Sequence, residues 1–195
     1  MRLFLLFLAS ILVVPSAVSG PFGTDMGMTK ADLGIASSAE ELAPYKYQIK
    51  NTPKNSRMFE TYIVTVTPNH GLCYLKAVGV DINTSRYGSE VRTQFERVDS
   101  ALKKKYASGE RVDFLRGGSI WDEPEDFMMG LVKKERLLQT YYDDEEGSKM
   151  VEDVQAAYLS ANGLAMEKGY LVLDYRFRNF DACQAEIRAI EDDVF

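Results

Sequence analysis

The stretch FETYIVTVTPNHGLCYLKAVGV, residues 59–80, decides the fold because it contains two apolar runs on either side of a turn sequence. The runs are Phe59–Thr67 and Leu72–Val80, and both are rich in β-branched and aromatic residues. Residues of this kind favour strands, and the sequence PNHG between the runs favours a tight turn. We therefore predict an antiparallel hairpin over this stretch.

The strongest helical pattern follows this hairpin. Val91, Phe95, Val98 and Leu102 recur at spacings of four, three and four residues, with charged residues between them. This spacing gathers apolar side chains on one face of an α-helix. We predict a helix over Ser89–Tyr106.

The rest of the chain alternates between extended and helical patterns. Further strands are predicted at Tyr45–Lys50, Glu110–Leu115, Glu135–Tyr142, Val154–Leu164 and Tyr170–Phe177, with a tight turn at Lys168-Gly169 before the last. Further helices are predicted from a Thr29 cap to Leu33, from an Asp122 cap to Lys134, and from an Asn179 cap to Asp192. This order predicts an α+β fold, an antiparallel sheet or sheets with packed helices. Two βββα units are a further hypothesis.

Residues 1–19 have the pattern of a cleavable secretory signal. A positive N-terminal end precedes the apolar run Leu3–Val14, and small residues precede the expected cut near Ser19. The run has about twelve residues, whereas a membrane-spanning helix needs roughly twenty. We expect a periplasmic or secreted protein with no stable membrane anchor and a single α+β domain over residues 20–195.

The charge of the expected mature chain argues against several partners. Removing residues 1–19 takes away one charge, that of Arg2, and leaves 22 Lys and Arg against 29 Asp and Glu, a net charge of −7. Binding to a phosphate backbone depends on clustered cations. We therefore expect neither nucleic acid nor an anionic membrane surface as a partner.

The mature chain has two cysteines, Cys73 and Cys183. An even number of cysteines in an exported protein predicts a single disulfide. Cys73 alternates with Leu75 on a predicted strand and Cys183 shares a helix stripe with Ile187, so we expect both to face inward. Closing so long a loop contributes on the order of 4 to 5 kcal/mol. The alternative is a pair of buried free thiols that never meet.

Three stretches resemble a family of exported bacterial proteins that has no assigned function. They are FGTDMGMT at residues 22–29, GGSIWDEPEDFMMGL at 117–131 and NFDACQAE at 179–186. The resemblance implies a bacterial periplasmic or secreted setting and carries no catalytic residues. In addition, the sequence GMT followed by a helix through Leu33 is similar to the opening of small BamE-like envelope proteins, a group that acts through protein contacts.

The usual catalytic and metal-binding groups are scarce. His70 is the one histidine; it lies in the predicted turn, and no G-x-S-x-G motif accompanies it. One histidine and two distant cysteines do not make a zinc site.

The acidic run at residues 143–146 lacks the spacing of a calcium loop, so a solvated loop explains it. Asn83 starts a glycosylation sequon, for which turn formation is the simpler explanation in a bacterial chain. We expect no catalytic residue of these kinds, no metal and no cofactor.

The acidic residues after Trp121 have two interpretations. Asp122, Glu123 and Glu125 crowd the first turn of a predicted helix, where the macrodipole favours negative charge. Alternatively, they form a carboxylate pair of a hydrolase, which needs two acids facing each other across a cleft.

Trp121 is the single tryptophan, and it also has two interpretations. It anchors the core, or it roofs a groove for an apolar ligand or a partner together with Phe127, Tyr141 and Tyr142.

These observations favour an exported, non-enzymatic protein that binds another envelope or secreted protein, or a small apolar ligand. The supporting features are the shortage of catalytic groups and an aromatic and methionine content sufficient for a contact surface. A secreted hydrolase that uses carboxylates alone, and an inhibitor or immunity protein of a secreted toxin, are the alternatives.

Overall fold

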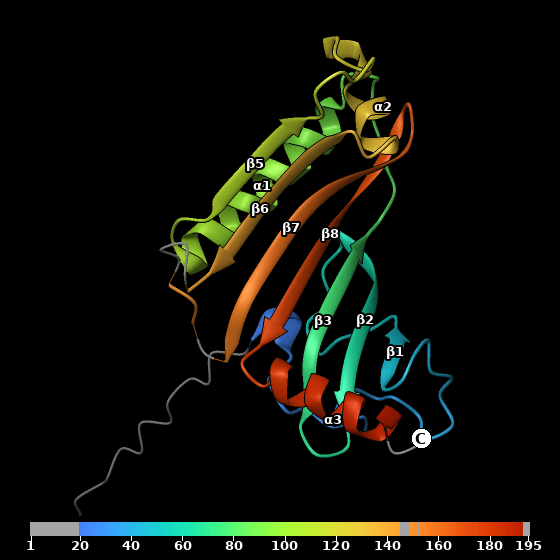
Figure 1. Ribbon diagram of the computed structural model, residues 1–195, viewed down its shortest axis with the longest axis vertical. Helices are drawn as coiled ribbons and strands as arrows, with labels where there is room; N and C mark the ends of the chain where they lie inside the picture. Colours follow the sequence, from blue (N-terminus) through green and yellow to red (C-terminus); the bar gives the residue numbers. More distant parts are fainter. Residues whose placement is uncertain (1–19, 145–148, 152, 193–195) are drawn as a thin grey trace, which may run out of the picture.

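The computed structural model describes residues 20–144, 149–151 and 153–192, so the expected signal lies outside the described residues. In this part of the chain, one eight-stranded sheet is accompanied by three α-helices (Figure 1). The strands are β1 (Lys46–Ile49), β2 (Phe59–Thr67), β3 (Gly71–Gly79), β4 (Ile82–Asn83), β5 (Glu110–Leu115), β6 (Arg136–Asp143), β7 (Val154–Ala165) and β8 (Lys168–Phe177). The helices are α1 (Ser89–Tyr106), α2 (Phe127–Val132) and α3 (Phe180–Asp192), with short 3₁₀ turns at Pro21–Gly23 and Pro124–Asp126. The predicted α+β class is confirmed.

The strands lie in the order β1-β2-β3-β8-β7-β6-β5, and every neighbouring pair is antiparallel. Two meanders, β1 to β3 and β6 to β8, meet where β3 pairs with β8. The short β4 pairs with the start of β8. The sheet is therefore continuous rather than divided into two.

One face of the sheet, called the inner face here, is buried. Helix α1 packs on β7 and β8 and buries Val91, Phe95 and Leu102. The segment before β1 covers the neighbouring part of the face: the Phe22 ring makes edge contacts with the rings of Tyr62 and Tyr175. Together, the helix and the N-terminal segment close one hydrophobic core over this face.

Helix α3 lies on the opposite face, called the open face here. The Phe180 ring contacts Tyr74, which alternates along β3 with the inward-facing Leu75. Figure 1 shows α3 in front of β2 and β3, and α1 behind the sheet. A two-fold axis that exchanged β3 and β8 would keep both helices on one face. The hypothesis of two equivalent βββα units therefore does not fit this arrangement.

Most predicted elements form close to their predicted bounds, and α1, β2 and β5 match them at both ends. Five local predictions were wrong. Residues 29–33 form turns rather than a helix, although Thr29 and Asp32 bond reciprocally as in a capping box. Asn83 belongs to β4 instead of a turn, and the tight turn before β8 lies at residues 166–167.

The other two errors concern helix caps. No side-chain cap bond forms at the start of the Pro124–Asp126 turn or of α2, and α2 begins at Phe127 rather than near Asp122. Before α3, the Asn179 amide donates to the carbonyls of His70 and Leu72 instead of capping the helix. No helix in the described part of the chain is both long and apolar enough to cross a membrane.

A buried carboxylate joins α1 to the sheet. Asp99 is 1% exposed, and its carboxylate lies 2.6 Å from the Lys103 amino group and accepts a hydrogen bond of 2.6 Å from the Tyr142 hydroxyl. Burial alone would raise the pKa of Asp99, but the bonds from Lys103 and Tyr142 outweigh it and lower the pKa. The carboxylate is therefore held in its charged form.

We predict that Asp99→Ala lowers the free energy of unfolding by about 2–4 kcal/mol at pH 7, because the buried Tyr142 hydroxyl loses its carboxylate acceptor. The lowered pKa means that this stabilisation is present above the unfolded-state pKa and is lost as the pH falls through the folded-state value. Urea unfolding at pH 7 and below pH 4 measures both effects. Glu96→Ala, on the same helix as Asp99, removes an exposed ion pair with Arg111 of β5 and is the control, with a loss of at most about 1 kcal/mol. Equal losses in the two variants would contradict the assignment.

Candidate binding surface

The groove predicted from Trp121, Phe127, Tyr141 and Tyr142 does not form. Tyr141 and Tyr142 are neighbours on β6 and point to opposite faces; Tyr141 is 38% exposed, whereas Tyr142 is fully buried against Asp99. Phe127 is buried, with the guanidinium groups of Arg92 and Arg136 over its ring.

Trp121 lies at the other end of the β5–β6 hairpin. Its segment joins the end where Leu115 pairs with Arg136, whereas Tyr141 pairs with Glu110. Five residues of strand separate these two ends, or about 17 Å. The four residues therefore cannot roof one groove together.

The acidic run at residues 122–126 does not supply a facing carboxylate pair. Asp122 and Glu123 are exposed, and Asp126 forms an ion pair of 3.3 Å with Arg86. Among the described residues, no three His, Cys, Asp or Glu side chains gather in a way that would hold a metal ion. His70 is partly exposed, and its Nε2 lies 4.0 Å from Glu186.

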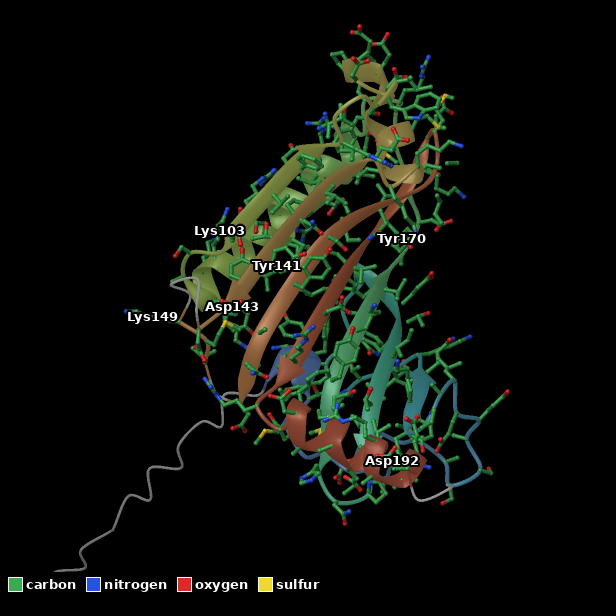
Figure 2. All side chains as sticks on the ribbon, viewed as in Figure 1. Lys103, Tyr141, Asp143, Lys149, Tyr170 and Asp192 are labelled. Atoms are coloured by element: carbon green, nitrogen blue, oxygen red, sulfur yellow. A yellow bond between two sulfur atoms is a disulfide. The ribbon has the colours of Figure 1, made fainter. Side chains whose placement is uncertain are left out.

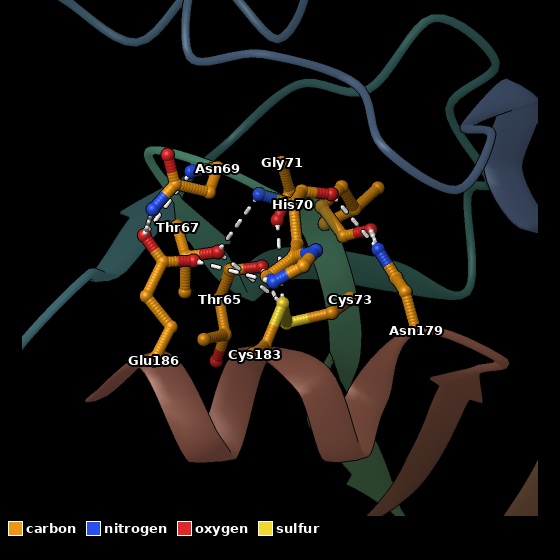
Figure 3. The surroundings of a disulfide bond; sticks show 10 residues. Thr65, Thr67, Asn69, His70, Gly71, Cys73, Asn179, Cys183 and Glu186 are labelled. Carbon is orange, nitrogen blue, oxygen red and sulfur yellow. Dashed lines mark hydrogen bonds and ion pairs between the residues drawn. A yellow bond between two sulfur atoms is a disulfide. The ribbon is translucent and has the colours of Figure 1, made fainter. Parts of the chain in front are cut away.

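Cys73 and Cys183 lie at disulfide distance, with their Cα atoms 6.5 Å apart, and join β3 to α3 (Figure 3). Cys183 is the one fully buried residue of α3 in the described part of that helix. The pairing predicted from sequence is thus the geometry that the structure has, but the reason given for Cys73 was wrong. A bulge opposite Thr65 and Val66 leaves Cys73 unpaired in the ladder and lets it point, like Tyr74, to the open face.

Polar bonds next to the cysteine pair hold α3 against the β2–β3 turn (Figure 3). Glu186 accepts hydrogen bonds from the backbone N–H of Asn69, at 3.1 Å, and from its side-chain amide, at 2.8 Å. Asn179 donates to His70 and Leu72 from the other end of the same turn. The position of α3 on the sheet therefore depends on this turn and on the cysteines more than on apolar burial.

We predict that Cys183→Ser, or reduction of the native protein, lowers the free energy of unfolding by about 2–5 kcal/mol. Without the bond, amide hydrogen exchange in α3 should become faster before exchange in the strands does, because Cys183 is the one fully buried residue in the described part of α3. The double variant Cys73→Ser/Cys183→Ser is the control and should not respond to reductant. Two thiols that react in the unfolded, unreduced protein would contradict the bond.

The open face carries an unbroken cross-strand row of side chains. Registers across the sheet align Glu110, Tyr141, Tyr158, Asp174, Lys76, Ile63 and Gln48. Tyr141 lies on β6, next to the edge strand β5 (Figure 2). The next row contains Tyr74 opposite Arg176. Side chains of neighbouring strands in one row lie close enough to act together.

Two neighbouring tyrosines of the row form an aromatic pair. The rings of Tyr141 and Tyr158 have centroids 4.6 Å apart and are tilted by 33°. The Tyr158 hydroxyl donates a hydrogen bond to Gln139. Burial, with a smaller effect of Tyr141, raises the pKa of Tyr158 to about 12. The pair therefore offers a fixed, neutral aromatic surface at physiological pH.

Asp174 lies beside these rings in a position that disfavours its charge. Its carboxylate accepts a hydrogen bond of 2.6 Å from the Tyr74 hydroxyl and lies 3.5 Å from the Lys76 amino group. Burial raises the pKa of Asp174 even though Tyr74 and Lys76 act in the opposite direction. A partly buried carboxylate whose charged form lowers the stability of the folded protein is typical of functional positions.

Two hollows meet at Tyr74 and Arg176. One, of about 200 Å³, is bordered by Tyr141, Tyr158 and Asp174. The other, of about 400 Å³, lies between α3 and the first three strands and is bordered by Lys46.

The Arg176 side chain is exposed at the junction of these hollows, and its guanidinium group lies 5.2 Å from the centre of the Phe180 ring. It forms no ion pair with any described residue. Its hydrogen-bond donors are therefore free to meet an acidic group from outside.

Comparison with protein-family models, with curated proteins and with solved structures finds no match. The resemblance to exported bacterial proteins therefore stays a prediction. The site rests on geometry alone, and sequence reasoning found only Tyr141 of its residues. Tyr74, Tyr158, Asp174 and Arg176 were missed, although their alternation with inward-facing residues is visible in β3, β7 and β8.

We predict that Asp174→Asn raises the free energy of unfolding at pH 7 by about 0.5–2 kcal/mol, the usual range of a single stabilising substitution. The folded-state pKa of Asp174 is raised, so the native protein loses stability as the pH rises from the unfolded value through the folded one. Asparagine does not titrate and escapes this loss. The difference from the native protein should vanish in acid, which urea unfolding at several pH values measures. Destabilisation by Asp174→Asn at pH 7 would contradict this account.

Proposed function

We propose that the protein is an exported, non-enzymatic binding protein, periplasmic or secreted, that contacts another protein through the open face of its sheet. The observation that carries the proposal is the row of partly exposed aromatic side chains on that face. Its composition supports a protein partner, because tyrosine, phenylalanine and arginine are enriched in protein interfaces. The secretory pattern of residues 1–19 and the cysteine pair support export.

A protein partner fits the surface better than a small apolar ligand. Pockets for small ligands are concave and bury most of the ligand. The open face instead extends beyond the hollows to Phe114 and Leu137, which are paired on β5 and β6 and are 51% and 39% exposed. Phe114 and Leu137 are cross-strand neighbours, and adjacent exposed apolar side chains of this kind mark protein interaction sites.

The unpaired guanidinium of Arg176 defines the chemistry of this partner. A protein that docks on the row would bring apolar side chains to Tyr141 and Phe114 and an acidic group to Arg176. Such a charge pair at the centre of an interface adds specificity and slows dissociation. An inhibitor or immunity protein would be one form of this binding.

Site-specific photo-crosslinking in the native envelope or secreted fraction tests the proposal. A benzoylphenylalanine at Tyr141 or Phe114 should give one discrete protein adduct, and the same group at Lys104, exposed on α1, should give none. Arg176→Glu should reduce the Tyr141 adduct at least about tenfold, because repulsion replaces a central charge pair. Arg97→Glu, an exposed charge reversal on α1, is the matched control and should leave the yield unchanged.

Three results would overturn the proposal. Equal adducts from Lys104 and Tyr141 would show that the open face has no preference. An unchanged yield of the Tyr141 adduct in Arg176→Glu would contradict the proposed contact between Arg176 and an acidic group of the partner. An adduct of small-molecule mass would replace the protein partner with a ligand.

A further inference from the structure

The backbone nitrogen of Gly20 faces a carboxylate. It donates a hydrogen bond of 3.0 Å to Oδ1 of Asp25, five residues further along the chain. A Cβ atom at this position would lie 2.2 Å from the backbone oxygen of Thr24. Position 20 therefore accepts glycine alone without a shift of the backbone, and this glycine is held beside Asp25.

The loop that presents Asp25 is fixed by its surroundings. Thr24 is fully buried, and its hydroxyl donates a hydrogen bond of 2.7 Å to the Pro21 carbonyl. The Phe22 ring packs against the hydrophobic core, and the Phe22 carbonyl accepts a hydrogen bond of 2.9 Å from the Lys54 N–H. Phe22 reaches this position with a left-handed φ of 54°. The geometry at Gly20 thus belongs to the folded domain.

We propose that removal of the leader at the Ser19–Gly20 bond creates an α-ammonium group on Gly20 that forms an ion pair with Asp25. Water adds across the peptide bond, the carboxylate leaves with Ser19, and the new amine on Gly20 takes up a proton. A peptidase of the export pathway supplies the catalysis. The inference rests on the export half of the proposed function and is independent of the open face.

Processing therefore replaces a hydrogen bond from an uncharged amide to the Asp25 carboxylate by an ion pair between the same two atoms, in which donor and acceptor are both charged. Other charged groups also face this terminus, because Lys54, Arg97 and Lys105 border the same hollow as Gly20. These cations disfavour a further positive charge, whereas Asp25 favours it. The effect of Asp25 is consequently measured as a difference between variants and not as an absolute pKa.

The sign of the pH dependence follows from the ion pair. Asp25 raises the pKa of the folded Gly20 amine relative to the same amine in a folded chain without that carboxylate. The stabilisation from the pair is present where the Gly20 amine and the Asp25 carboxylate are both charged, and it is lost as the pH rises through the folded-state pKa of the amine. The pair strengthens the fold at neutral pH and not in alkali.

The test uses the processed protein, recovered after export. Intact mass first establishes whether the chain begins at Gly20. NMR titration of the Gly20 α-carbon then gives the pKa of its amine in the native protein and in Asp25→Asn, which keeps an acceptor oxygen and loses the charge. We expect the amine pKa to fall by about 0.5–1 unit in Asp25→Asn, the effect of one charge at this distance in a solvated environment. Asp122→Asn, an exposed acid elsewhere, should leave it unchanged.

An equal amine pKa in the native protein and Asp25→Asn would overturn the proposal, and so would a mature chain that begins at another residue. Neither result bears on crosslinking at Tyr141. Conversely, the absence of a Tyr141 adduct would remove the binding function and leave the Gly20 ion pair standing.

Discussion

The ladder between β3 and β8 is the constraint on which the rest of the structure depends. It pairs Tyr74 with Arg176 and continues to Val78 with Val172, joining two meanders that are otherwise separate. On the inner face it places Leu75 next to Tyr175 in the core, and on the open face it places Lys76 next to Asp174. One set of backbone hydrogen bonds therefore builds both the hydrophobic core and the candidate binding surface.

Local elements could be predicted because their signals are local. The apolar spacing from Val91 to Leu102 defines α1, and the β-branched run Phe59–Thr67 defines β2. The arrangement of these elements in the sheet could not be predicted in the same way, because no local pattern in β3 indicates that it pairs with β8. The short β4 was missed because two residues carry no periodicity; its pairing with Lys168 and Gly169 arises from the tertiary fold.

The candidate site was largely hidden for a related reason. Its side chains come from β3, β6, β7 and β8, and they become neighbours only through register. Tyr141 and Tyr142 were placed together because they are adjacent in sequence, although strand geometry sends adjacent residues to opposite faces. For Cys73 the alternation rule failed instead, because the bulge beside Thr65 interrupts it. The partner Cys183 was predicted correctly because the sequence contains no other cysteine.

Strand β5 is the last strand of the sheet, and no described strand pairs with its outer side. Exposed edges of this kind recruit strands from other molecules and promote aggregation. Here the edge carries fixed charges: Arg111 is held by Glu96, and Asp113 by Arg136. Charged side chains along an edge discourage the addition of a further strand. The protein thus resists self-association through this edge, while Phe114 on the same strand remains accessible to a partner that approaches the flat side of the sheet.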